Sequence, residues 1–138
     1  MHLIKFSEED PDMQLVRLAK EEEGVGISAG AHFAGLKSAM LMQNHGFLAS
    51  VNGIVSLAQL YRVPLLMIIS YRGEMGETDP WQTEGGLRTE STLKALDIPY
   101  DIIDSPESVE KKINKAAILS ESSERPVALL ITRDLMVE

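Results

Sequence analysis

Apolar positions along the chain follow two patterns that alternate from one end to the other. Short, nearly continuous apolar runs are typical of buried strands, and apolar residues three or four positions apart are typical of amphipathic helices. The first pattern predicts strands at residues 13–19, 38–42, 65–69, 99–103 and 126–131. The second pattern predicts helices at residues 24–35, 48–61, 87–96 and 106–119. Residues 1–13 fit neither pattern, so we expect an irregular terminus there.

This alternation predicts a single α/β domain over residues 1–138. The sheet is expected to be parallel, with right-handed crossovers that place helices on both faces and give three layers. We expect the strand at 38–42 to be buried on both faces, because its apolar run is continuous. Ligands of such sheets bind beyond the carboxyl ends of the strands. The site is therefore predicted around residues 21–22, 43–46 and 70–76.

Glycine is concentrated in and just after the first predicted helix, at Gly24, Gly26, Gly30 and Gly35. Each glycine costs up to about 1 kcal/mol relative to alanine in a helix interior. We interpret these positions as permitting close approach to another backbone or to a ligand.

Three carboxylates, Glu21, Glu22 and Glu23, stand where a predicted strand gives way to this helix. Acidic side chains in a first helical turn stabilise the helix dipole by a few tenths of a kcal/mol. That interpretation accounts for Glu21 and Glu23, whereas Glu22 takes a further role from the resemblance given below.

A polar turn of Asn44, His45 and Gly46 follows the strand at 38–42. Asparagine and glycine are common turn residues, so a capped turn is one interpretation. The other is functional, because a histidine here can change charge near neutral pH and contact an anion or move a proton. We interpret His32, inside the first helix, as a satisfied and partly buried side chain.

The segment 70–86 is predicted to be a loop that is too long for a plain connector, and two of its glycines permit hinge motion, so it is a candidate lid. Arg72 follows the clearest strand, and its guanidinium is suited to hold a carboxylate, sulfonate or phosphonate through two parallel hydrogen bonds. The alternative for Arg72 is a salt bridge to Glu74 or Glu77.

Composition narrows the functional classes. The chain of 138 residues is 44% hydrophobic and 25% charged, which is typical of a globular domain. It has no cysteine, which excludes disulfides and thiolate metal sites and fits a cytoplasmic protein. No apolar run reaches membrane-spanning length. The net charge of −8 argues against nucleic-acid binding, and an anionic ligand would need local cations, a metal or another chain.

Motifs of several enzyme classes are absent from the sequence. There is no phosphate loop, no dinucleotide-binding glycine pattern after a strand and no nucleophile elbow. The histidines and aspartates lack the spacing of metal ligands, so we expect this chain to hold no metal of its own.

Three segments together resemble a known family. They are E-E-E-G-V-G-I-S-A-G-A from Glu21, M-Q-N-H-G-F-L-A-S-V-N-G-I from Met42, and P-L-L-M-I-I-S-Y-R-G-E-M-G-E from Pro64. They are similar to the alpha subunits of sulfopyruvate decarboxylases and to the matching half of phosphonopyruvate decarboxylases, both of which depend on thiamine diphosphate. The resemblance extends over residues 14–131 and implies the pyrimidine-binding domain of the thiamine diphosphate-binding fold, without its first strand and helix.

The resemblance also implies roles for individual residues. In this family a glutamate at a strand-to-helix junction hydrogen-bonds the aminopyrimidine ring of the cofactor, and matching the pattern assigns that catalytic role to Glu22. Asn44 and Gly46 are expected beside the cofactor. Arg72, Asn44 and His45 are expected near the substrate, with His45 as a second catalytic candidate.

The diphosphate-binding motif of the family, G-D-G followed by an asparagine, is absent from this chain. The resemblance therefore implies that a partner chain, a beta subunit, holds the diphosphate and Mg²⁺ within a homo- or hetero-oligomer. The implied function is decarboxylation of a small anionic 2-oxo acid, with sulfopyruvate first and phosphonopyruvate as the alternative. A non-catalytic binding or assembly module derived from the same domain is the alternative of another class.

Overall fold

In the computed structural model, which describes residues 2–136, four parallel strands form one sheet with the order β1-β2-β4-β3. The strands are β1 (Ala39–Gln43), β2 (Leu65–Ser70), β3 (Tyr100–Ile103) and β4 (Pro126–Ile131). The helices are α1 (His2–Glu9), α2 (Glu21–Phe33), α3 (Asn44–Ala49), α4 (Val51–Gly53), α5 (Pro80–Ala95) and α6 (Val109–Ser123). A π-helical segment, η1 (Ile54–Gln59), continues α4, and short 3₁₀ turns are η2 (Pro106–Ser108) and η3 (Arg133–Leu135).

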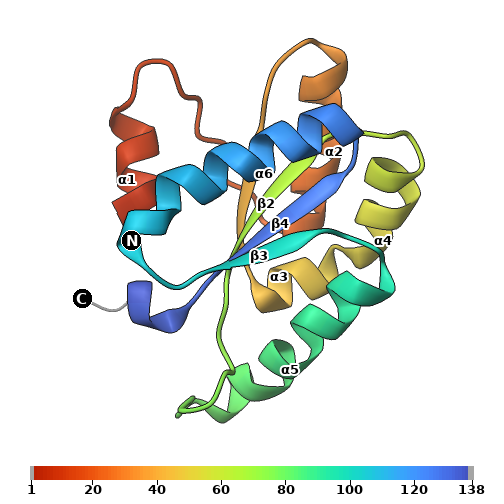
Figure 1. The fold of residues 1–138 in the computed structure, drawn as a ribbon. Coiled ribbons are helices and arrows are strands. Elements are labelled where there is room, and N and C mark those ends of the chain that lie inside the picture. The colour runs from red at the N-terminus through yellow and green to blue at the C-terminus, as the bar shows by residue number, and fades with distance from the viewer. Residues whose placement is uncertain (1, 137–138) are drawn as a thin grey trace.

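Successive side chains of a strand point to opposite faces, so the interior strands β2 and β4 contribute to two apolar clusters, one on each face of the sheet. Leu65, Met67 and Ile69 of β2 face a large cluster with α2, α3 and η1, whereas Leu66 and Ile68 face a smaller cluster with α6. Helices therefore cover both faces, and Figure 1 shows α6 crossing one face of the sheet while α3 and α5 lie on the other. The predicted three-layer parallel fold is confirmed.

The prediction that the strand at 38–42 is buried on both faces is wrong. β1 is an edge strand in which Met40 and Met42 are buried, while Leu41 on the other face is 41% exposed. The cause is the position of α6, whose apolar contacts reach β2, β3 and β4 but not β1.

The N-terminal predictions are also wrong. Residues 2–9 form α1, and residues 13–18 form no strand, because they pair with no neighbour within the described residues. Met13, Val16 and Leu18 are exposed. A run of apolar residues at strand length is a strand only where its backbone pairs with a neighbouring strand.

The long loop predicted at 70–86 is shorter, because α5 begins at Pro80 instead of residue 87. Proline at a first helical position fits the helix N-terminus, and Asp79 stands at the N-cap. Gly85 and Gly86, which disfavour a helix by propensity, are both buried within it. Because neither residue has a side chain, α5 can pack closely against His45 at Gly85 and against the backbone of Arg72 and Gly73 at Gly86.

The predicted helix at 48–61 consists of the end of α3, then α4 and η1 in succession. Ile54 and Ala58 are buried, whereas Val55 beside them is 41% exposed. Residues 54–59 form a π-helix, in which the N–H of Leu60 donates to the carbonyl of Val55 (3.3 Å). This i+5 pattern changes the angular spacing of the side chains. None of the helices in the described part of the chain has both the length and the apolar character needed to cross a membrane.

Two glycine substitutions should change stability in opposite directions. A Cβ on Gly86 would lie 2.1 Å from the Arg72 carbonyl oxygen and 2.6 Å from the Cα of Gly73, whereas one on Gly30 would meet no atom within 4 Å. We expect Gly86→Ala to lower the free energy of unfolding by about 1–3 kcal/mol or more, since backbone atoms must move. Gly30→Ala should raise it by up to about 1 kcal/mol through helix propensity. Urea unfolding followed by circular dichroism measures both, and equal shifts would contradict the packing described here.

Candidate active site at the carboxyl edge of the sheet

The carboxyl ends of all four strands meet at one edge, because the sheet is entirely parallel. The register pairs Gln43 of β1 with Ser70 of β2, and Ser70 with Ile131 of β4. The residues that follow these strands therefore lie side by side. The sequence predicted a site at the ends of β1 and β2, and the register adds the end of β4.

Asn44 joins the ends of β1 and β2. It is the first residue of α3 and is fully buried. Its Nδ2 donates a hydrogen bond to the Arg72 carbonyl (2.6 Å), and its Oδ1 accepts one from the Arg72 backbone N–H (3.1 Å). The side chain thus binds both backbone groups of Arg72 in the way that a neighbouring strand would. The predicted contacts of Asn44 with cofactor and substrate stay predictions. The hydrogen bonds that the structure shows hold the backbone of Arg72 in place.

Glu21 and Glu22 diverge although they are neighbours in sequence. The Glu21 side chain is partly buried and lies over Gly46, where an added Cβ would come 2.5 Å from its Cγ. Glu22 is exposed and lies toward Gly53 of α4, where an added Cβ would be 3.3 Å from the Glu22 Cγ. Glu21, which the sequence analysis interpreted only as a helix-dipole residue, therefore faces the edge occupied by the start of α3. One residue along a helix changes the side-chain direction by about 100°, which the run of three glutamates cannot reveal.

His45 lies beside Asn44 at the start of α3 and is exposed. Its imidazole covers the backbone of Gly85, where an added Cβ would lie 2.6 Å from Cε1 and 2.7 Å from Nε2. The ring is thus held between α3 and α5, and its orientation depends on the absence of a side chain at residue 85. The structure places Glu21 against Gly46 and His45 beside it, at the end of β1 instead of at the end of the predicted strand 13–19, which does not form within the described residues.

Arg72 forms the salt bridge to Glu77 that the sequence analysis kept as an alternative. Its Nε lies 2.7 Å from Glu77 Oε2, and its Nη2 lies 2.8 Å from both Glu77 Oε1 and Asp79 Oδ2. Glu77 is only 4% exposed at its side chain. The Arg72 guanidinium, followed by backbone N–H groups, lowers the pKa of Glu77 far below its ordinary value. Whether Arg72 also contacts substrate stays a prediction.

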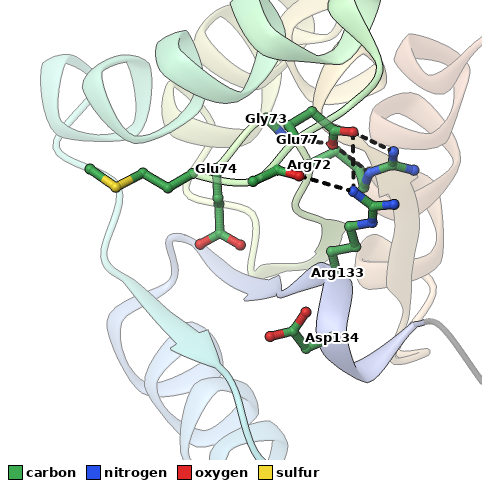
Figure 2. Close-up of a pocket in the computed structure, with 8 residues that line it drawn as sticks. Arg72, Gly73, Glu74, Glu77, Arg133 and Asp134 are labelled. Carbon is green, nitrogen blue, oxygen red and sulfur yellow. Dashed lines mark hydrogen bonds and ion pairs between the residues drawn. The ribbon is translucent and has the colours of Figure 1, made fainter.

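A cavity of about 210 Å³, called here the edge cavity, opens beside this salt bridge and is shown in Figure 2. It is lined by the loop after β2 and by the turn after β4: Arg72, Gly73, Glu74, Met75, Gly76, Glu77, Arg133 and Asp134. Arg133 Nη1 lies 3.5 Å from Glu77 Oε1. Arg133 was not predicted as a site residue, although it stands two residues beyond β4 as Arg72 stands two residues beyond β2. Burial raises the pKa of Glu74, and nearby Asp134 adds to this effect.

A second polar cluster anchors α5 behind the loop. The hydroxyls of Tyr71 and Tyr100 donate to the two carboxylate oxygens of Glu90, at 3.0 and 2.5 Å. The hydrogen bond from Tyr100 is the largest cause that lowers the pKa of Glu90, while burial raises the pKa of Tyr71. Glu90 was not predicted from the sequence, because nothing in a helix repeat indicates two tyrosine partners, one just after β2 and one in β3.

Within residues 2–136, no three histidine, aspartate or glutamate side chains are grouped closely enough to hold a metal ion. Acidic side chains also outnumber basic ones in the edge cavity. Its acids are Glu74, Glu77 and Asp134, and its cations are Arg72 and Arg133.

Comparison with known proteins gives a consistent result. No protein-family model matches the chain. The chain is 39% identical over 129 residues to the sulfopyruvate decarboxylase subunit alpha of Methanococcus maripaludis, an alignment that covers 94% of this chain and 77% of that protein. It is 40% identical over 129 residues to the subunit of the same name from Methanocaldococcus jannaschii, covering 94% and 76%. A phosphonopyruvate decarboxylase of Streptomyces viridochromogenes is 30% identical over 95 residues, which covers 68% of this chain and 24% of that protein.

Removal of the Asn44 side chain should destabilise the carboxyl edge. We expect Asn44→Ala to lower the free energy of unfolding by about 2–4 kcal/mol, since the partly buried backbone groups of Arg72 lose both partners and the buried amide leaves a gap. Asn114→Ala, at an exposed position of α6, is the matched control and should change it by less than about 0.5 kcal/mol. Urea unfolding measures both, and an Asn44→Ala value as small as the control would contradict the described role.

Proposed function

Because this chain belongs to the family of sulfopyruvate decarboxylase alpha subunits, we propose that it is the alpha subunit of a decarboxylase that converts sulfopyruvate to sulfoacetaldehyde and carbon dioxide. The observation that carries this proposal is the identity of 38–40% with three alpha subunits over 94% of the chain. Phosphonopyruvate is the second candidate substrate, favoured by the more distant similarity to a phosphonopyruvate decarboxylase. That similarity extends over only 24% of the relative's length, which ranks it below sulfopyruvate.

Thiamine diphosphate is the proposed cofactor, and it would supply the electron sink that loss of carbon dioxide from a 2-oxo acid requires. A carboxylate that faces the carboxyl edge and is partly shielded from water fits the aminopyrimidine part of this cofactor. Glu21 meets this description, because it lies over Gly46 and is partly buried. We therefore propose Glu21 for the contact that the resemblance assigned to Glu22, and the two assignments are separable by mutation. Glu21 would hold a proton shared with a ring nitrogen.

The diphosphate and Mg²⁺ do not fit the residues of this edge. The acids there would repel a diphosphate, and the described residues include no group able to hold a metal ion. We propose that a beta subunit with the diphosphate-binding domain holds both. The names of the related alpha subunits support a partner subunit in general. Exposed Met75 and Trp81, one in the loop after β2 and one at the start of α5, offer apolar area for such a contact.

The substrate would lie between His45 and the loop that begins at Arg72. His45 has an exposed ring whose orientation is fixed by Gly85, so it is suited to donate a hydrogen bond or a proton to a nearby oxygen. The cations at the ends of β2 and β4 are the groups available for an anionic head. This chain thus binds and orients the substrate, and a partner would exclude water by covering the edge.

The proposed activity can be tested directly. A neighbouring reading frame that encodes the G-D-G and asparagine motif identifies the partner, which is then produced together with this chain. We expect the complex with thiamine diphosphate and Mg²⁺ to release carbon dioxide from sulfopyruvate faster than from phosphonopyruvate, and either chain alone to release almost none. If both chains are folded and associated but release no carbon dioxide from either acid, the chain is a non-catalytic module of the same fold.

The two glutamates provide a matched pair of variants. We expect Glu21→Gln to lower kcat by about 100-fold or more, since a charged hydrogen bond and a proton-transfer group are lost together. Glu22→Gln, one residue away and exposed, should change kcat less than about threefold, a size typical of a surface substitution. Steady-state carbon dioxide release measures both. The reverse ranking would return the role to Glu22.

A further inference from the structure

The carboxylate of Glu77 collects more hydrogen bonds than any other side chain in the described part of the chain. Oε2 accepts from Arg72 Nε (2.7 Å) and from the Gly73 N–H (3.1 Å). Oε1 accepts from Arg72 Nη2 (2.8 Å) and from the N–H groups of Thr78 (2.9 Å) and Asp79 (3.0 Å). One nearly buried carboxylate therefore fixes both ends of the loop between β2 and α5.

The loop would otherwise have few restraints. Gly73 and Gly76 have positive φ angles of 91° and 92°, so the chain turns twice within four residues. The only backbone hydrogen bond within the turn joins the Glu77 N–H to the Glu74 carbonyl (3.0 Å) among the described residues. The shape of the loop thus depends on the side chain of Glu77 more than on regular structure.

Glu77 also contacts two arginines that follow the ends of the neighbouring strands β2 and β4. Arg72 and Arg133 stand at equivalent positions, two residues beyond paired Ser70 and Ile131. Both contact the same carboxylate oxygen, at 2.8 and 3.5 Å. Within residues 2–136, Arg72 Nη1 and Arg133 Nε and Nη2 form no hydrogen bond to the protein, and both side chains line the edge cavity. These N–H groups are the donors left for a ligand.

We propose that Glu77 is a positioning residue of the candidate site: it holds Arg72 and Arg133 so that their remaining N–H groups receive the anionic head of the substrate, which Glu77 itself does not touch. This inference rests on the proposed function, because it names the recognition of the same substrate.

The charges of the edge cavity explain why position matters more than net charge. Glu74 and Asp134 face the same cavity, and Glu77 neutralises much of the charge of Arg72. The cavity therefore has no excess of positive charge to attract an anion over a distance. Affinity must come from N–H donors at fixed distances and angles, and guanidinium recognition of a sulfonate or carboxylate is sensitive to such geometry. A loop that lost its central acceptor would lose that geometry.

The test compares Glu77→Gln with Glu84→Gln in the complex of this chain with its partner. Glu84 is an exposed carboxylate on α5 that also pairs with an arginine, Arg88 (3.6 Å), so it is a matched control. We expect Glu77→Gln to raise KM for sulfopyruvate about 10-fold or more with kcat changed less than about threefold, as the loss of a charged hydrogen-bond acceptor implies. Glu84→Gln should leave both constants unchanged. A purely structural role of Glu77 would instead lower the fraction of folded enzyme, and hence apparent kcat, at unchanged KM, and that result would overturn the proposal.

A double-mutant cycle covers the case in which Glu77→Gln folds poorly. Arg133 is partly exposed and its contacts are long, so Arg133→Gln should fold normally. We expect it to raise KM in the wild-type background and to have a smaller effect together with Glu77→Asp, because the second change already displaces Arg133. Independent, additive effects would overturn the proposal.

Calorimetric binding of sulfopyruvate to the complex without thiamine diphosphate separates this proposal from the proposed function. Weaker binding by Glu77→Gln, together with a wild-type complex that releases no carbon dioxide, would reject the decarboxylase function and support the role of Glu77. Equal binding by both proteins, or no binding by the wild type, would overturn the role of Glu77 whatever the activity.

Discussion

The carboxyl edge of the sheet depends on the pair of hydrogen bonds between the Asn44 side chain and the Arg72 backbone. Beyond Gln43 and Ser70 the two strands separate, since one chain enters α3 and the other enters a loop. The buried Asn44 amide replaces one further rung of backbone pairing. It therefore fixes the start of α3, which orients His45, and the start of the loop, which orients Arg72. A single buried amide thus relates the two halves of the candidate site.

Close packing by glycine completes this arrangement from the side of α5. A Cβ on Gly86 would strike the backbone of the loop, and a Cβ on Gly85 would strike the ring of His45. Two adjacent glycines, costly for helix propensity, are used to bring one helix against two different site elements. The penalty is offset by packing at Thr89 and Leu93, which are buried one and two turns further along α5.

The layers, the parallel sheet and all four observed strands could be predicted from periodicity alone, because strands and helices alternate from β1 onward. The fifth predicted strand, at 13–19, does not form within the described residues. Edges were less predictable: β1 has the composition of a central strand, and only the placement of α6 decides which of its faces is covered. Site segments were found from strand ends, yet Arg133 was missed because the end of β4 was not considered. The direction of Glu21 and the hydrogen bonds of Glu77 depend on side-chain geometry that sequence spacing does not contain.

The two edges of the sheet also differ in how their charges are satisfied. Near the amino ends of the strands, Lys37 pairs with Glu121 (2.7 Å) and Arg62 pairs with Glu124 (3.4 Å), so these charged side chains have partners within the chain. At the carboxyl edge, Glu21, Glu22, Glu74 and Asp134 form no ion pair within residues 2–136. Unpaired carboxylates at one edge lower the affinity for any anion that this chain must hold alone. The proposed recognition of an anionic substrate therefore depends on N–H donors held as firmly as Glu77 holds those of Arg72, and the proposed diphosphate needs cations from another chain.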